Sequence, residues 1–142
     1  MIVNSIPNLV NKVTFINHTR DLPSYLMLAD VVLSCSTKPE AFGRTVLEAQ
    51  AMGKPVIAFN HGGSVELINE NENGILCKVA DVNDLTVNIE KVLQLSTYKR
   101  KVLSKKSISN VNKKYLTKFM CKKTLNLYIK LIKSFREKNI NN

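Results

Sequence analysis

The sequence of 142 residues has no tryptophan, only three cysteines and no apolar run of about 18 residues, so no membrane-spanning segment is predicted. Its first residues lack the basic start and apolar centre of a secretory signal, so no leader is expected. The cysteines, Cys35, Cys77 and Cys121, are odd in number and far apart. This spacing argues against a disulfide framework or a metal site and predicts reduced thiols in a cytoplasmic protein.

Acidic residues are scarce in the C-terminal third. Residues 1–90 contain six Lys or Arg and ten Asp or Glu (net −4), whereas residues 91–142 contain fifteen and one (net +14). An AT-rich genome, indicated by abundant asparagine, lysine and isoleucine, would explain part of this charge. Lysines interleaved with aromatic residues favour an anionic membrane surface as a partner, and the absence of a base-reading motif argues against nucleic acid. These lysines are Lys105, Lys106, Lys113, Lys114, Lys118, Lys122, Lys123, Lys130 and Lys133.

The chain alternates strand-like and helix-like segments. Residues 2–11 are expected to form a loop or the end of a helix, and the alternating, β-branched segment 12–17 predicts a strand. A short helix is predicted over 22–30, with Pro23 near its start. The later segments predict strands over 31–36, 54–59 and 74–79, then a helix capped by Asp81, and helices over 98–110 and 112–137.

The most informative stretch is residues 35–66. A helix is predicted to start after Phe42-Gly43 and to stop at Gly53, and the apolar strand KPVIAF follows it. After His61-Gly62-Gly63, Ser64 is expected to cap another helix, with Glu66 in its first turn. The order strand, glycine turn, helix, strand, glycine turn, helix is typical of parallel α/β sheets, which bind anionic ligands at the carboxyl ends of their strands.

A phosphate site is predicted where the first of these helices begins. The backbone amides of Gly43, Arg44 and Thr45 have no partner within the helix, and glycine lets a phosphate approach the backbone. Glu48 lies one turn further on, with its carboxylate directed back towards the crevice, where it suits the paired hydroxyls of a ribose. Glu40, on the preceding loop, is expected on the other side of the phosphate.

The pattern S-x-x-x-P-E-x-F-G-x-x-x-x-E-A-x-A-x-G-x-P-V-I-A, followed by G-G-x-x-E, begins at Ser36. It resembles the retaining GT-B glycosyltransferases of family 4, which build lipopolysaccharide, capsule and glycolipids from nucleotide sugars. The resemblance implies that Glu40 contacts donor-sugar hydroxyls as the catalytic-site glutamate and that Glu48 contacts the ribose. It places Phe42 and Gly43 at the sugar and phosphate, and Arg44 and Thr45 at the phosphate.

The resemblance extends over roughly residues 8–110. It implies a UDP- or GDP-linked donor sugar, no metal or other cofactor, and a glycan or lipid-linked acceptor. Family members hold the nucleobase near the end of the strand expected at 12–17, which makes Asn17, His18 and Thr19 candidates for base binding.

The same resemblance implies that half of an enzyme is missing. The fold expected is α/β, a Rossmann-like parallel sheet with helices on both faces that lacks its first two strands, with a basic helical C-terminal tail. Residues 1–110 are interpreted as a partial nucleotide-sugar-binding domain and residues 111–142 as the basic helix. Without the first two strands, segment 12–17 either pairs with strand 31–36 or leaves that strand with an open apolar edge. A separate N-terminal half, a non-catalytic remnant and a basic membrane-surface module all remain open.

Overall fold

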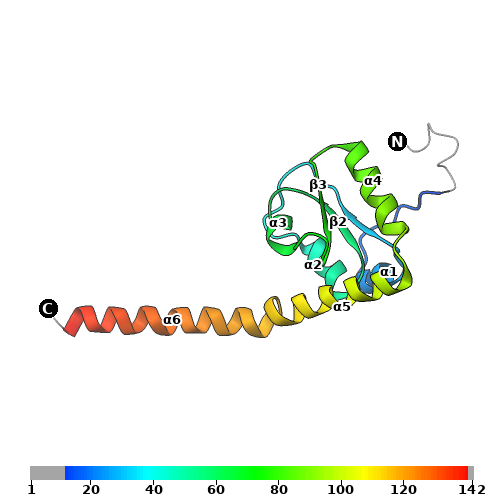
Figure 1. Cartoon of the computed structure of the whole chain (residues 1–142). Coiled ribbons are helices and arrows are strands. Elements are labelled where there is room, and N and C mark those ends of the chain that lie inside the picture. Colours follow the sequence, from blue (N-terminus) through cyan, green and yellow to red (C-terminus); the bar gives the residue numbers. More distant parts are fainter. Residues whose placement is uncertain (1–11, 141–142) are drawn as a thin grey trace.

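The computed structural model describes residues 12–140, which form a small parallel α/β unit followed by a long helix (Figure 1). The sheet has three strands among these residues, in the order β1 (Val32–Ser34), β2 (Val56–Phe59) and β3 (Ile75–Cys77). Leu33 lies opposite Ile57, which in turn lies opposite Ile75. All four residues of β2 are buried, so the predicted central apolar strand is confirmed.

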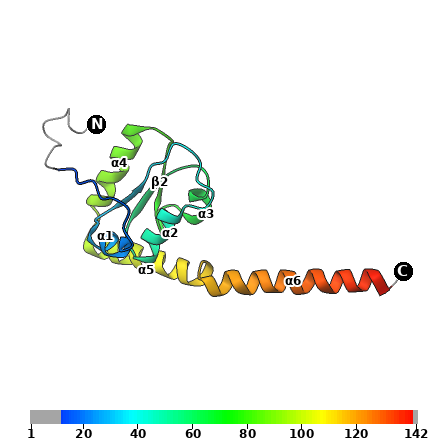
Figure 2. The same ribbon diagram turned by 180° about the vertical axis from the view of Figure 1, so that it is seen from behind.

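Helices cover both faces of the sheet, as predicted (Figures 1 and 2). On one face, α1 (Leu22–Leu28), α2 (Arg44–Ala51) and α3 (Ser64–Leu67) pack against the sheet in a core that includes Val46, Ala49, Val56 and Leu67. On the other face, α4 (Val82–Leu93) closes a second core. That core contains Ile57, Phe59, Cys77 and Val92.

Two predicted helix boundaries follow the local chemistry. The side chain of Asp81 accepts a hydrogen bond from the Asp84 amide at 3.0 Å, which confirms it as the cap of α4. Gly53 has φ +67°, and the amides of Gly53 and Lys54 return to the carbonyls of Gln50 and Ala49 at 3.0 and 2.9 Å. This is the paired hydrogen bonding of a glycine-terminated helix, so α2 stops where the sequence predicts.

The prediction of a strand over residues 12–17 is wrong. These residues form an exposed, irregular segment in which Phe15 is 63% and Ile16 is 54% exposed. A strand is stable only when a neighbour pairs with it, and among the described residues β1 pairs with β2 alone. Within residues 12–140 the second alternative therefore holds: β1 pairs along one edge only, and Leu33 is 41% exposed.

The C-terminal residues form two helices with different surroundings. The first, α5 (Thr97–Lys114), packs against α2, and the guanidinium of Arg100 donates to the Val92 and Leu93 carbonyls at 3.0 Å, at the end of α4. The proposed domain boundary at residue 110 falls inside this helix.

The second helix, α6 (Thr117–Ile140), projects away from the α/β unit in both views (Figures 1 and 2). Within residues 12–140, no helix has the length and hydropathy needed to cross a membrane. The segment 2–11 lies outside the described residues.

Candidate functional site

The two glycine turns of the central stretch pack backbone against backbone. The amide of Gly63 donates to the Glu40 carbonyl at 2.8 Å. A Cβ at Gly63 would lie 2.4 Å from the Phe42 carbonyl oxygen, and one at Gly62, which has φ +58°, would lie 2.5 Å from the Glu40 carbonyl oxygen. Only glycine permits this approach, so both turns are held at one end of the sheet.

The starts of α2 and α3 are neighbours. Gly43, with φ +85°, is the N-cap of α2, and a Cβ there would lie 3.6 Å from the Ser64 amide nitrogen. No side chain caps α2, so the first amides of the helix, including those of Arg44 and Thr45, are left for a ligand or water. This is the backbone arrangement that a phosphate site requires.

The prediction that Ser64 caps α3 is wrong. Gly63 is the N-cap and already has helical dihedral angles (φ −63°, ψ −20°), so Ser64 stands inside the first turn. From there its hydroxyl makes no capping hydrogen bond. Glu66 does lie in the first turn, as predicted.

A hollow of about 760 Å³ lies between segment 16–20, α1 and α2. Its walls bring the three base-binding candidates, Asn17, His18 and Thr19, together with Arg44 and Glu48. The sequence predicts the base-binding candidates and the Arg44–Glu48 pair on different elements, and the hollow brings the two groups together. The remaining lining residues are Ile16, Arg20, Leu22, Pro23, Tyr25, Leu26, Ala51 and Met52.

The other predicted site residues lie outside this hollow. Glu40, Phe42, Gly43 and Thr45 are not among its lining residues, and the Glu40 side chain is exposed on the loop before α2. The structure thus brings Glu48 together with the base-binding candidates but does not place Glu40 in the same hollow.

Phe42 is held by a residue that sequence reasoning missed. Its ring meets that of Tyr115 edge to face, with centroids 6.5 Å apart and planes at 69°. The Tyr115 hydroxyl donates to the Glu66 carbonyl at 3.3 Å. Tyr115 is the C-cap of α5, so the residue that directly follows that helix ties the Phe42 loop to α3. No local pattern predicts this contact, because the two aromatic residues are far apart in the sequence.

Arg44 and Glu48 form an ion pair of 3.0 Å one turn apart on α2. The Arg44 side chain is 81% exposed and the Glu48 side chain 35% exposed. An exposed pair of this spacing contributes only about 0.3–0.5 kcal/mol, so a ligand can separate it at little cost. Once separated, the pair would offer a guanidinium that can turn to an anion and a carboxylate that can accept hydrogen bonds.

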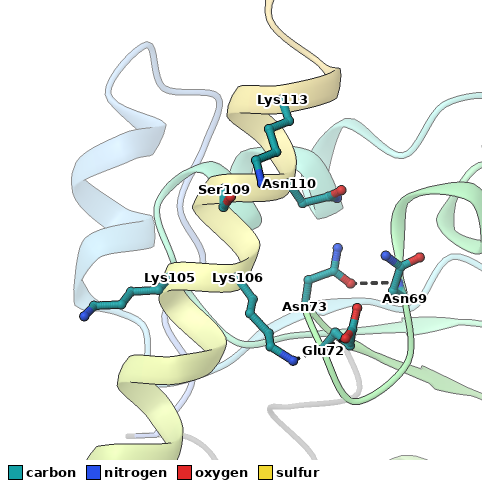
Figure 3. A pocket seen from close by; sticks show the side chains of 8 residues that line it. All are labelled: Asn69, Glu72, Asn73, Lys105, Lys106, Ser109, Asn110 and Lys113. Carbon is teal, nitrogen blue, oxygen red and sulfur yellow. Dashed lines mark hydrogen bonds and ion pairs between the residues drawn. The ribbon is translucent and has the colours of Figure 1, made fainter.

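A second polar hollow of about 350 Å³, between α5 and the turn at 69–73, contains none of the predicted site residues (Figure 3). In this view Lys106 reaches Glu72, an ion pair of 3.2 Å, whereas Lys105 points away from it. The Asn69 amide donates to the Asn73 side chain at 2.7 Å. The positive charges do not converge on one point, so we assign this hollow to the packing of the turn on α5.

Gln50 supports that turn from inside and was also missed from the sequence. It is fully buried, and its Nε2 donates to the Leu67 and Asn73 carbonyls at 3.1 and 3.2 Å. Its Oε1 is buried with no hydrogen-bond partner. Gln50 thereby joins α2 to the end of α3.

The cysteines do not form a reactive site. Burial raises the pKa of the Cys35 and Cys77 thiols, which keeps both protonated at neutral pH. All three cysteines are free, and among the described residues no group of His, Cys, Asp or Glu is arranged to hold a metal ion.

The chain has a parallel α/β sheet and, beside a hollow, a helix that starts at a glycine with no side-chain cap. These features are typical of α/β domains that bind anionic ligands at the ends of their strands. Comparison with known proteins makes this specific. The model of the family Glycosyl transferases group 1 matches residues 7–110, and the chain belongs to that family. Its fold is that of a GT-B glycosyltransferase C-terminal domain.

Individual relatives support the same family assignment. The chain is 34% identical over 118 residues to trehalose synthase of Thermococcus litoralis, covering 83% of this chain and 27% of that protein. It superposes on a glycosyltransferase from Rickettsia africae with a TM-score of 0.85 and 33% identity, covering 89% of this chain and 34% of the other. It also superposes on Anabaena HepE in complex with UDP-glucose (TM-score 0.69, 31% identity, 74% and 29% covered). The chain therefore spans about a quarter to a third of the length of these relatives.

Proposed function

We propose that this chain is the donor-binding part of a retaining family 4 glycosyltransferase. It would bind a UDP- or GDP-linked sugar for transfer to a glycan or lipid-linked acceptor, such as a lipopolysaccharide or capsule precursor. The observation that carries the proposal is the 760 Å³ hollow that joins Asn17, His18 and Thr19 to Arg44 and Glu48. Its size and mixed lining suit a nucleoside.

Each residue has a role in this proposal. The base lies against segment 17–19, and Glu48 accepts hydrogen bonds from the ribose hydroxyls after its ion pair with Arg44 opens. The amides of Gly43 to Thr45 bind phosphate together with Arg44. Glu40 and Phe42, on the adjoining loop, contact the sugar, and Glu40 positions the donor rather than moving a proton. In this scheme helix amides and Arg44 supply the positive charge, and no metal is required.

Retention would place the acceptor on the same face of the sugar as the leaving phosphate, which helps to deprotonate the acceptor. Residues 1–11 contain no Arg or Lys, so before segment 12–17 the chain has no counterpart of the Arg–Lys pair that the resemblance implies for the departing diphosphate. We therefore propose that full activity needs a separate N-terminal half and that the protein works in the cytoplasm, at the inner face of the membrane. Alone, the chain should bind donor nucleotides weakly, because part of the cleft is absent.

The test is a titration of the chain with UDP, GDP and UDP-glucose, in which binding is detected by the chemical shifts of the backbone amides in NMR spectra. We expect millimolar binding of at least one nucleotide, with the largest shifts at the amides of Arg44 and Thr45. Glu48→Gln should weaken binding of nucleotides about tenfold, because it loses a charged acceptor for the ribose hydroxyls. The matched control is Glu72→Gln, which removes the same charge at the other hollow and should leave binding unchanged.

Two results would contradict the proposal. One is the absence of shifts at these amides at several times the expected dissociation constant. The other is strong, specific stabilisation of the isolated chain in a thermal-shift titration, because this would show that the cleft is complete without a further half. An acceptor-transfer assay with and without the product of a neighbouring gene would then separate a split enzyme from a remnant that binds donor without activity.

A further inference from the structure

The loop that carries Glu40 is not held in place by burial. It runs from Ser36 to Phe42, between β1 and α2, and every residue in it is exposed. A segment with few buried contacts opens at a low free energy unless hydrogen bonds tie it to the rest of the structure. The position of the Glu40 carboxylate therefore depends on the hydrogen bonds that this loop makes with its neighbours.

Two hydrogen bonds join this loop to the loop that follows β2. The Gly63 amide donates to the Glu40 carbonyl at 2.8 Å. At the start of the loop, Nε2 of the His61 imidazole lies 2.8 Å from the Ser36 carbonyl oxygen. The Ser36 hydroxyl in turn donates to the Lys38 carbonyl at 2.9 Å, which fixes the turn before Glu40. The loop is thus held at two points by residues of one neighbouring loop.

The position of His61 follows from the strands. β1 and β2 are parallel, with Ser34 opposite Ala58, so the loops after them leave the same edge of the sheet. The His61 amide donates to the Phe59 carbonyl at 2.8 Å, directly after β2. This hydrogen bond fixes the backbone at the end of the strand, from which the ring reaches the Ser36 carbonyl.

The hydrogen bonding of the ring shows what His61 contributes. A carbonyl oxygen only accepts hydrogen bonds, so Nε2 of His61 carries the hydrogen that the Ser36 carbonyl receives. The other ring nitrogen, Nδ1, is buried and has no hydrogen-bond partner among the described residues. A buried polar atom without a partner opposes folding, so stability alone would favour a side chain that lacks it. The contribution of the ring is therefore one directed donor, Nε2, to the loop that carries Glu40.

We propose that His61 is a positioning residue for the donor sugar, because its hydrogen bond to Ser36 holds the loop from which Glu40 contacts that sugar. The role of Glu40 rests on the proposed function, whereas the hold of His61 on the loop does not. In this scheme His61 touches neither nucleotide nor sugar. Loss of its donor should therefore weaken binding of the sugar and spare that of the nucleotide, since Gly63 still packs on the end of the loop next to α2.

The first measurement needs no ligand. Cys35 directly precedes Ser36 and is partly buried, so its rate of alkylation at a fixed alkaline pH reports on opening at this end of the loop. His61→Leu should raise that rate about fivefold, the effect of losing one hydrogen bond. His61→Gln, whose side-chain amide can still donate to the Ser36 carbonyl, should stay within about twofold of the parent rate.

The matched control is Asn60→Leu, which places the same side chain one residue earlier, at an exposed position of the same loop. It should leave the labelling of Cys35 as in the parent chain. Cys77 is fully buried and should stay unlabelled in every variant, which shows that the chains are folded. His61→Phe keeps a flat ring without a donor, so it should behave as His61→Leu does and replaces that variant if Cys77 becomes exposed.

The second measurement is titration of the full chain with UDP, UDP-glucose, GDP and GDP-mannose, followed by the amide shifts of Arg44 and Thr45. For the pair that binds, His61→Leu should raise the dissociation constant of the sugar nucleotide about fivefold and that of the nucleotide by less than about twofold. Glu40→Gln should have the same selective effect. A chain with both substitutions should bind no more weakly than Glu40→Gln alone, because the two residues act through one contact.

Three results would overturn the proposal. They are unchanged labelling of Cys35 in both His61→Leu and His61→Phe, equal losses of affinity for nucleotide and sugar nucleotide, and losses that add in the double variant. Failure of the proposed function gives a different pattern. In that case no nucleotide shifts the amides of the parent chain, or Glu40→Gln leaves sugar-nucleotide binding unchanged, while faster labelling of Cys35 still shows that His61 holds the loop.

Discussion

Replacement of Gly63 by alanine is expected to lower the free energy of unfolding by about 2–4 kcal/mol. The backbone of Gly63 is helical, so alanine itself is not strained there. The cost comes from position: the new Cβ would lie 2.4 Å from the carbonyl carbon and oxygen of Phe42, which are backbone atoms and cannot rotate away. The two turns would have to move apart to make room for the methyl group. This movement would also lengthen the 2.8 Å hydrogen bond from the Gly63 amide to the Glu40 carbonyl.

The assay is urea unfolding followed by pulse labelling of the Cys77 thiol, which is fully buried in β3 and reports on the core alone. Ser64→Ala is the matched control, since Ser64 is adjacent and makes no capping hydrogen bond, and it should stay within about 0.5 kcal/mol of the parent. Gly62→Ala should cost at least as much as Gly63→Ala, because it adds a left-handed φ to a backbone contact. A Gly63→Ala chain as stable as the control would refute the backbone-to-backbone packing.

Three further predictions concern the core, a cap and the thiols. Gln50→Leu should destabilise the chain by about 1–3 kcal/mol in the same urea assay, because two backbone carbonyls lose a buried donor, and unchanged stability would show that the hydrogen bonds are dispensable. Asp81→Ala should cost about 1 kcal/mol and speed amide exchange in the first turn of α4, whereas Asp81→Asn should restore the parent value; equal loss in both would exclude the cap. At neutral pH an alkylating reagent should modify exposed Cys121 first. Labelling of Cys35 should begin only at higher pH, since burial raises the pKa of its thiol, whereas Cys77, which is fully buried, should react only when the chain unfolds; equal rates for all three would contradict this.

Local chemistry made much of the central stretch predictable. Gly43 and Gly53 bound α2 because a left-handed residue flanks each end of that helix, and both have positive φ. The segment Val56–Phe59 is apolar throughout because helices cover both faces of β2. Asp81 caps α4 through an interaction only three residues long. Such features depend on neighbours in the sequence, and the sequence therefore specifies them.

Features that depend on distant neighbours were not predictable. Segment 12–17 has the alternation of a strand, yet it has no adjacent strand to pair with in the described chain. No motif in the sequence marks Gln50, and its importance appears only when the turn to which it donates is in place. Tyr115 looked like one of several aromatic residues in a basic tail, but it packs on Phe42. The hollow that joins Thr19 to Glu48 likewise exists only after α1 and α2 have packed.

The isolation of α6 has a consequence for any measurement of unfolding. The 24 residues of α6 contribute strongly to the far-ultraviolet signal, but none of the described side chains of this helix belongs to the two cores that would make it melt with the sheet. Heating the protein should therefore give an early, gradual loss of helical signal followed by a steeper one. A single midpoint fitted to such a curve would describe neither process, and the cooperative part would appear smaller than it is.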